Sequence, residues 1–328
     1  MAELAGVSIA TVSRALNGSP RVLPATRALV EEAVAQLGYV PNPAARSLVT
    51  GRTSTIALVV SEPESRLFSD PFFAAVVHGI SSAIADGDLQ LVLLLAHTER
   101  EHVKVERYVR QGHVDGVILM SLHGDDPLPR RLVEAGVPTV LSGRPSAAAG
   151  QIPYVDADNR GGGRSAAACL LARGSRTIAT VTGPLDMTAA VDRYEGYREA
   201  MAAAGRSEDA RLVAHADFSV EGGERAMRQL LGRVPDLDAV FVASDPMAVG
   251  ALIALRAEGR RVPDDVAVVG FDDAPLAATT RPALTTVRQP LEAMTRAMVA
   301  LLLGRIEGTA RDDEHVTCET VLVSRVSA

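Results

Sequence analysis

The residues near the start of the chain that are best suited to chemistry lie between positions 8 and 17. This stretch sets short polar side chains beside apolar Val12 and Leu16, as a helix with one buried face requires. Arg14 can donate two parallel hydrogen bonds to a guanine, and Ser8 can cap the helix N-terminus near a phosphate. The short donors that could position a nucleic-acid backbone are Thr11, Ser13 and Asn17. The pattern is that of a helix that enters a DNA major groove, although an ordinary helix with a solvated polar face has similar residue types.

A second set of hydrogen-bonding side chains follows the predicted strands of the remaining chain. Ligands of open α/β sheets bind beyond the carboxyl ends of the strands. Carboxylates and hydroxyls can exchange hydrogen bonds with sugar hydroxyls, an aromatic face can pack on a pyranose ring, and Arg193 adds a fork of donors. The residues after the strands are Asp70, Phe72, Ser142, Asp186, Phe218, Ser244 and Asp272. The two phenylalanines fit an ordinary buried core equally well.

Three short helices would position the first set. Their expected ranges are 2–6, 8–17 and 24–37, with Gly38 as a left-handed stop after the third. The apolar residues that could form one small core are Leu4, Val7, Val12, Leu16, Val22, Leu29, Val30, Ala33 and Leu37. Pro41 and Pro43 prevent the third helix from continuing, so residues 39–52 form the expected linker, with a further helical turn or two at 44–49.

From residue 54 the chain alternates apolar strands with amphipathic helices, and the alternation restarts once. Strands are expected at 55–60, 89–95, 116–120 and 138–142, and again at 176–181, 210–214, 238–243 and 266–271. The predicted fold class is therefore α/β, with two doubly wound lobes of parallel sheet behind the helical head. A last helix at 290–303 and the segment 315–325 are expected to cross back between the lobes.

Composition narrows the class of protein. A length of 328 residues with 47% hydrophobic residues fits two or three compact units. No apolar run approaches the ~18 residues of a membrane span, so a cytoplasmic protein without a membrane partner is expected. Residues 1–53 hold five arginines and three glutamates, so a head of net charge +2 precedes a remainder of −9 in a chain of total charge −7. Such asymmetry is expected when only one end meets phosphates.

Motifs of catalysis and cofactor binding are missing from the sequence. It has no G-x-S-x-G nucleophile elbow, no phosphate loop and no spaced His/Cys metal set, and Cys169 and Cys318 are far apart. The sequence therefore predicts no enzyme, no cofactor and no metal site. Asp158 and Asn159 before the glycines at 161–163 predict a helix cap rather than a phosphate site. An enzyme on a Rossmann-like scaffold and a sugar transport receptor are the alternatives, and residues 1–6 lack the signal peptide that the receptor would need.

The segment AGVSIATVSRALNGSPRVLPATRALVEEAVAQLGYVPNPAARSL, followed by an α/β body, resembles the LacI/GalR family of bacterial transcriptional regulators. Further matches are GRTSTIALVV, DPFF, VDGVIL, VDADNRGGG, RYEGYREAM, ASDPMAVGAL, VAVVGFDDAPLA and PALTTVRQP, so the resemblance covers essentially the whole chain. It implies a helix-turn-helix head at 1–40, a hinge helix and linker at 41–53, and a core at 54–328 similar to periplasmic sugar-binding proteins. The first lobe would hold about 54–154 and 290–315, and the second about 155–289 and 316–328.

The resemblance also implies roles for single residues. It places Ile9, Ala10 and Arg14 against bases, and Leu48 of the hinge helix in the minor groove. The phosphate or anchoring contacts that it implies are Ser8, Thr11, Ser13, Asn17, Thr26, Tyr39 and Asn42. The effector-pocket positions that it implies are Asp70, Phe72, Arg193, Phe218, Ser244, Asp272 and Gln289. The implied function is a homodimeric repressor of a palindromic operator, controlled by a sugar or sugar derivative, with a nucleoside or purine as the alternative effector.

The head departs from the family pattern at two places. Family members carry several more residues before the equivalent of Ala2, and Met1 stands where they have valine. An in-frame GTG valine codon read as an initiator would explain the difference, and it predicts a start further upstream. Leu23 and Pro24 stand where the family has a serine cap, and a proline at the first helical position compensates in part.

Overall fold

The head contains two helices in the computed structural model, which describes residues 1–16, 21–39, 51–146 and 151–328. Helix α1 spans Ile9–Leu16 and α2 spans Pro24–Leu37, in agreement with the expected ranges. Gly38 has a φ of 56°, and its N–H is directed at the carbonyls of Val34 and Ala35, which confirms the left-handed stop. Pro24 begins α2 without a side-chain cap from Leu23.

Residues 2–6 form turns, so the expected first helix is wrong. The N–H of Ala5 donates to the Met1 carbonyl (2.9 Å), and Gly6 follows at once with a φ of +64°. Closing the first hydrogen-bonded turn of a helix is unfavourable, and the turns that follow normally offset that cost. Here a left-handed residue follows the first such hydrogen bond, so the helix does not continue.

The core of the head is smaller than the sequence suggested. Its buried residues are Ala5, Val12, Ala15, Val22, Val30 and Ala33. Leu4, Leu29 and Leu37 were expected there, but they are 51%, 50% and 54% exposed. In a head this small, each helix can bury only one narrow face. On α2 the buried face contains Val30 and Ala33, and Leu29 lies beside that face and is exposed.

The first lobe is a six-stranded parallel sheet in the order β11-β5-β4-β3-β1-β2. The strands are β1 (Thr55–Val60), β2 (Gln90–Leu95), β3 (Gly116–Met120), β4 (Thr139–Ser142), β5 (Tyr154–Ala157) and β11 (His315–Cys318). The helices are α4 (Glu64–Ser69), α5 (Pro71–Ala83), α6 (Glu99–Arg110), α7 (Leu128–Glu134) and α12 (Leu291–Glu307). Alternate residues of β1 pack into two different clusters, one with α5 and α12 and the other with α6 and α7. Helices thus cover both faces, which explains the uninterrupted apolar sequence of β1.

The second lobe repeats this plan with the sheet order β12-β10-β9-β8-β6-β7. Its strands are β6 (Ile178–Thr182), β7 (Val213–His215), β8 (Ala239–Val242), β9 (Ala267–Asp272), β10 (Thr285–Arg288) and β12 (Val321–Val323), the last antiparallel to β10. Helices α8 (Asn159–Ala172) and α9 (Thr188–Ala203) pack on one face, and α10 (Val220–Arg233) and α11 (Asp245–Ala257) on the other. Two short 3-10 helices, η2 (Ala210–Leu212) and η3 (Pro275–Ala278), complete the lobe. The first of them occupies most of the strand expected at 210–214, because Asp209 accepts a hydrogen bond from the Arg211 N–H and turns the chain.

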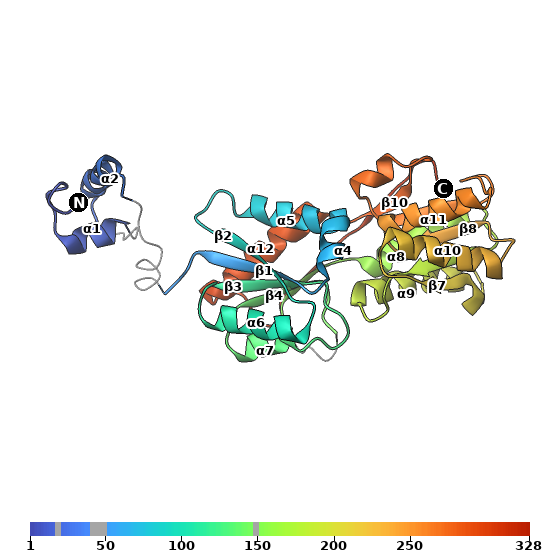
Figure 1. The fold of residues 1–328 in the computed structure, drawn as a ribbon, viewed down its shortest axis with the longest axis horizontal. Coiled ribbons are helices and arrows are strands. Elements are labelled where there is room, and N and C mark those ends of the chain that lie inside the picture. Colours follow the sequence, from blue (N-terminus) through green and yellow to red (C-terminus); the bar gives the residue numbers. More distant parts are fainter. Residues whose placement is uncertain (17–20, 40–50, 147–150) are drawn as a thin grey trace.

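The chain crosses between the lobes after β5, after β10 and after β11 (Figure 1). Helix α12 therefore belongs to the first lobe, where it packs against α5. The boundaries expected at 154/155 and 315/316 fall inside or at the edge of strands of the first sheet, so the crossings lie a few residues later. Strands β5 and β11 pair with each other, which ties both segments to the first lobe until Ala157 and Cys318. Among the described residues, no helix has the length and apolar character to cross a membrane.

Candidate functional site

Helix α1 divides its residues into a buried and an exposed face. Val12 and Ala15 are buried in the core of the head. The exposed residues on the opposite face of the helix are Ile9, Ala10, Ser13 and Arg14. Ser8 begins the helix as expected, because its hydroxyl accepts a hydrogen bond from the Thr11 N–H (3.1 Å) and contacts the Thr11 hydroxyl (2.8 Å). The exposed face therefore carries one arginine, one large apolar side chain (Ile9, 80% exposed) and two small side chains, and a cap precedes it.

The remaining residues predicted to contact DNA lie at the edges of the head. Thr26 is half-buried in the first turn of α2, and Tyr39, which follows α2, is 43% exposed. Asn17, Asn42 and Leu48 lie outside the described residues, as does the hinge helix expected at 44–49.

A cavity lies between the two lobes at the carboxyl ends of their strands. Its volume is about 110 Å³, and we refer to it as the inner cavity. All seven residues predicted for the effector pocket line its wall: Asp70 and Phe72 from the first lobe, Arg193, Phe218, Ser244 and Asp272 from the second, and Gln289 from the crossing after β10. The structure therefore brings together side chains that lie more than 200 residues apart in the sequence.

Arg193 is a buried side chain of this wall and is fixed by several contacts. It is 6% exposed, and it donates to the Ala243 carbonyl (2.7 Å) and to Asn159 Oδ1 (2.8 Å). Its Nη1 lies 3.3 Å from Asp272 Oδ1, and its guanidinium carbon lies 3.8 Å from the centre of the Phe271 ring. Burial lowers the pKa of Arg193, but a guanidinium beside a carboxylate stays protonated at neutral pH.

Asp272 is held from two sides. It pairs with Arg193, and it accepts a hydrogen bond from Gln289 Nε2 (2.7 Å). Burial raises the pKa of Asp272 to about 6, and the Arg193 guanidinium opposes that rise. Its carboxylate is therefore ionised at neutral pH, when it can accept further hydrogen bonds from a ligand in the cavity.

Glycines let Arg193 reach the cavity from α9. A Cβ at Gly163 of α8 would lie 2.1 Å from the Arg193 carbonyl oxygen, and a Cβ at Gly196 of α9 would lie 2.0 Å from the Arg160 carbonyl oxygen. The two helices can approach this closely only because neither residue has a side chain. Asp158 caps α8 by accepting from the Gly161 N–H (2.7 Å), which confirms that the glycine run belongs to a helix cap.

The first lobe contributes a more open wall. Asp70 caps α5 by accepting from the Phe72 N–H (3.0 Å), and burial raises the pKa of Asp70. The Arg66 guanidinium lies 4.8 Å from the centre of the Phe218 ring, across the cleft, and pairs with Glu62. The Phe218 ring also packs closely on Gly183 of the second lobe, where a Cβ would lie 2.1 Å from the ring. The ring of Phe218 therefore contacts both lobes.

Backbone strain is concentrated at this cavity. Of the five non-glycine residues with positive φ among the described residues, Ser121 (57°), Phe218 (64°) and Asp272 (109°) line it. Such conformations cost about 1–3 kcal/mol each for non-glycine residues and persist where the surrounding structure fixes them, which is common at functional sites.

The two lobes contact each other around the cavity. His123 of the first lobe lies between two carboxylates, 3.1 Å from Glu62 Oε1 and 3.0 Å from Asp186 Oδ2 of the second lobe. Arg144 of the first lobe pairs with Asp192 of the second (2.8 Å). The structure therefore shows the two lobes in contact beside the cavity, through charged and hydrogen-bonding side chains.

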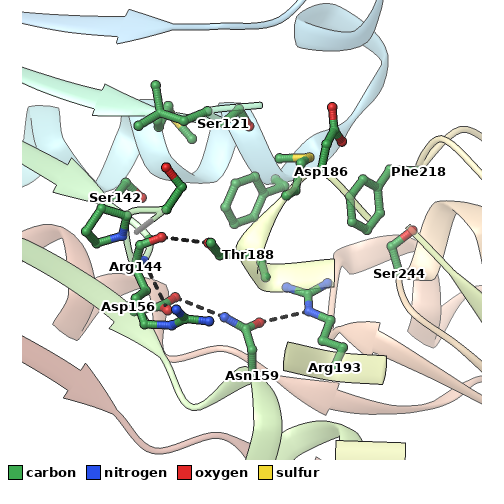
Figure 2. A pocket seen from close by; sticks show the side chains of 18 of the residues that line it. Ser121, Ser142, Arg144, Asp156, Asn159, Asp186, Thr188, Arg193, Phe218 and Ser244 are labelled. Carbon is green, nitrogen blue, oxygen red and sulfur yellow. Dashed lines mark hydrogen bonds between the residues drawn. The ribbon is translucent and has the colours of Figure 1, made fainter. Parts of the chain in front are cut away.

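The wall also contains residues that the sequence did not assign to the effector pocket, and Arg144, Asp156 and Asn159 are three of them. Asn159 was expected only as part of a helix cap, but it donates to Asp156 Oδ1 (2.9 Å) and accepts from Arg193. Asp156 also accepts from the Arg144 N–H (3.1 Å), and burial raises the pKa of Asp156 to about 6. Figure 2 shows Arg144, Asp156, Asn159 and Arg193 as one line of hydrogen bonds. The motif VDADN at the end of a buried strand contains three polar residues, Asp156, Asp158 and Asn159, but the sequence could not show which of them point into the cavity.

A second, wider space opens from the inner cavity towards solvent. It has a volume of about 880 Å³, and we refer to it as the outer hollow. The two spaces share Arg66, Asp70, Asp126, Asp186 and Phe218. Side chains that line only the outer hollow include Glu62, Ser65, His102, His123, Asp217 and Glu221.

Comparisons with known proteins agree with this geometry. Residues 1–42 match the family "bacterial regulatory proteins, lacI family", and residues 167–328 match a periplasmic binding protein-like domain. The chain is 52% identical over 328 residues to the HTH-type transcriptional regulator CelR of Thermobifida fusca, covering 100% of this chain and 96% of the relative.

Solved structures that cover nearly the whole chain include two complexes with a small ligand. One is a complex of the transcriptional regulator CelR with cellobiose, at 50% identity and a TM-score of 0.82, covering 100% of this chain and 98% of that one. The other is a lac repressor dimer bound to operator and the anti-inducer ONPF, at 26% identity and a TM-score of 0.85, covering 99% and 97%. The expected fold class is confirmed. With a full-length relative at this identity and a helix-turn-helix head of this geometry, the chain belongs to the lacI family of bacterial regulatory proteins and is a DNA-binding transcriptional regulator.

Proposed function

We propose that the chain is a repressor that binds a palindromic operator as a homodimer, and that its effector is a neutral glucose disaccharide, cellobiose or a close analogue, held in the inner cavity. Because operator DNA lies in the bacterial cytoplasm, the proposal places the protein there. The proposed repressor function, dimer and operator are based on the similarity to the lac repressor complex. The proposed sugar is based on the similarity to the CelR complex.

The pairing of every cavity arginine with a carboxylate is the observation that carries the effector class. Arg66 pairs with Glu62, Arg144 with Asp192, and Arg193 with Asp272. An anionic ligand such as a sugar phosphate would need an unpaired arginine and would also meet the carboxylates of Asp70 and Asp156. Neutral hydroxyls, by contrast, can donate to these carboxylates, and Phe72 and Phe218 offer apolar faces to a sugar ring.

The similarity to a regulator solved in complex with cellobiose supports a disaccharide rather than a monosaccharide. A monosaccharide would leave part of the polar wall without partners, which costs binding free energy.

The effector can act on DNA binding through the segment that joins the head to the first lobe. Asp115 at the start of β3 accepts hydrogen bonds from the Thr53 N–H (2.6 Å), the Thr53 hydroxyl (2.9 Å) and the Ser54 N–H (2.8 Å). Arg52 donates to the Ile306 carbonyl (3.4 Å) at the end of α12. These contacts fix the chain to the first lobe at the end of the proposed hinge helix and linker at 41–53. A change in the angle between the lobes would therefore alter the placement of the two hinges of a dimer.

We also propose that the cavity binds its ligand without chemical conversion. Asp70 is engaged as a helix cap, Asp272 by Arg193 and Gln289, and Ser244 as the cap of α11, whose Met247 N–H donates to its hydroxyl (3.3 Å). Groups engaged in this way position a ligand, whereas a nucleophile needs an adjacent base oriented towards it.

Titration of the full chain with cellobiose tests the proposed function. We expect saturable heat release in a calorimeter, a higher melting temperature, and a change in affinity for DNA fragments from upstream of bacterial sugar genes, followed by fluorescence anisotropy at fixed salt. Equal affinity for such fragments and for random DNA would contradict the operator proposal. Absence of cellobiose binding would contradict the effector proposal.

A further inference from the structure

The outer hollow is lined from both lobes by side chains suited to hydroxyl groups. Ser65 and His102 of the first lobe face Asp217, Ser219 and Glu221 of the second across it. Pro63, Pro184 and Pro246 add apolar faces between these polar groups. Carboxylates and hydroxyls beside apolar surfaces are the chemistry that the inner cavity also offers, so both spaces suit one class of ligand.

Two buried polar atoms in the wall of the outer hollow have no hydrogen-bond partner. Among the described residues there are four such side-chain atoms, and Arg66 Nε and His102 Nδ1 are two of them. The Nε2 of His102 lies 2.8 Å from the Ala96 carbonyl oxygen, and Nδ1 lies 3.6 Å from Glu99 Oε2, beyond hydrogen-bond distance. Residue His102 is 8% exposed. A buried donor or acceptor without a partner costs about 1–3 kcal/mol, and a polar ligand that reaches it recovers that cost.

Arg66 and Phe218 mark the boundary between the two spaces. Both residues line the inner cavity and the outer hollow, and the guanidinium lies over the ring at 4.8 Å. A ligand that extends from one space to the other passes beside Arg66, whose Nε lacks a partner. Carboxylates outnumber arginines around the outer hollow, since Glu62, Asp125, Asp217 and Glu221 line it with Arg66. These carboxylates disfavour an anionic extension and can accept hydrogen bonds from the hydroxyls of a neutral one.

We propose that the outer hollow is a subsite for a third sugar unit, so that the protein binds a neutral linear trisaccharide with two units in the inner cavity and one beyond Arg66. This inference rests on the proposed function and adds the length of the ligand to it. The polar wall beyond Arg66 gives the third unit hydrogen bonds that a disaccharide does not make. We expect cellotriose to bind about tenfold more tightly than cellobiose, the gain that one or two net hydrogen bonds supply.

Calorimetric titration of the full chain with cellobiose and with cellotriose tests this subsite. Ser65→Trp and Glu221→Trp each place a large ring in the outer hollow from an exposed position, one from each lobe, and neither residue lines the inner cavity. We expect both substitutions to lower cellotriose affinity to that of cellobiose or below and to leave cellobiose affinity unchanged. Glu64→Trp is the matched control, because Glu64 is exposed on the same helix as Ser65 and lines neither space.

Three outcomes would overturn the subsite. Cellotriose could fail to bind where cellobiose binds, it could bind without a gain in affinity, or its gain could survive both substitutions. Each of these leaves the disaccharide effector standing. Failure of both sugars to bind the wild-type chain would instead overturn the proposed effector and the subsite together.

Discussion

The head and the inner cavity are both proposed binding sites, but they present their binding residues in opposite ways. The residues of α1 proposed to contact DNA bases are exposed, and Arg14 projects from a helix whose stability depends on Val12 and Ala15 on the other face. The proposed effector residues are buried, and Arg193, Asp272 and Asn159 hold one another in place. In the head, recognition and stability are carried by different side chains. In the cavity the same side chains carry both.

This difference predicts that substitutions in the cavity lower the free energy of unfolding, whereas substitutions on the exposed, DNA-contacting face of α1 lower only the affinity for DNA. Arg193→Ala has the largest expected effect. It leaves the Asp272 carboxylate buried without its cation and the Ala243 carbonyl without its donor. Breaking a buried pair in this way costs about 3–5 kcal/mol, which urea unfolding followed by circular dichroism measures for the core.

Arg198→Ala is the control for that experiment. Arg198 lies on the same helix, but it is 41% exposed and pairs with Glu195 and Glu208 at the surface. Surface pairs contribute about 0–1 kcal/mol. Equal losses for the two variants would show that the buried network does not carry the stability of this wall.

Arg14→Ala tests the other half of the comparison. Loss of a two-pronged contact with guanine should cost about 1–3 kcal/mol of binding free energy and should relax the preference for guanine at one position. The free energy of unfolding should change by less than about 0.5 kcal/mol, because Arg14 is exposed. Fluorescence anisotropy at fixed salt, on the DNA fragment that the wild-type chain selects and on single-base variants of it, measures both expectations. A uniform loss on every base variant would assign Arg14 to phosphate instead.

Apolar periodicity in the sequence predicted most elements of both regions, and the family resemblance implied seven of the residues that line the inner cavity. It did not predict which side chains hold one another. Asn159 was assigned to a cap, yet its amide links Asp156 to Arg193, a contact between residues 34 positions apart. The crossing points were displaced for the same reason, since the pairing of β5 with β11 joins segments that no local pattern connects. Partners distant in the sequence were the part that local spacing could not reveal.

Ser8→Ala has a smaller expected effect and bears on the stability of the reading helix itself. The Ser8 hydroxyl accepts from the Thr11 N–H at the start of α1, and loss of such a cap costs about 0.5–2 kcal/mol. Hydrogen exchange of α1 amides in the full chain should accelerate, while exchange in the two lobes stays unchanged. Ser8→Gly should cost only a few tenths of a kcal/mol, because glycine also suits the capping position. Equal acceleration by both variants would mean that the hydroxyl contact does not stabilise the helix.

The pH dependence of effector binding should be the smallest effect, and it tests whether the polar contacts between the lobes add to the affinity of the cavity. Hydrogen bonding to Glu62 first, and then to Asp186, raises the pKa of His123. Only the doubly protonated ring donates from both nitrogens to these carboxylates. A histidine pKa that is higher in the closed form stabilises closure fully below the ordinary value of about 6.5, and that contribution is lost as pH rises through the raised pKa.

Cellobiose affinity measured by calorimetry should therefore fall as pH rises from 7, a range in which Asp156 and Asp272, with pKa values of about 6, are already ionised. In His123→Gln the amide keeps one contact across the cleft but does not titrate, so the decline should disappear. If the variant shows the same decline as the wild type, a group other than His123 sets the pH dependence. The contacts between the lobes would then be maintained by other pairs, such as that of Arg144 with Asp192.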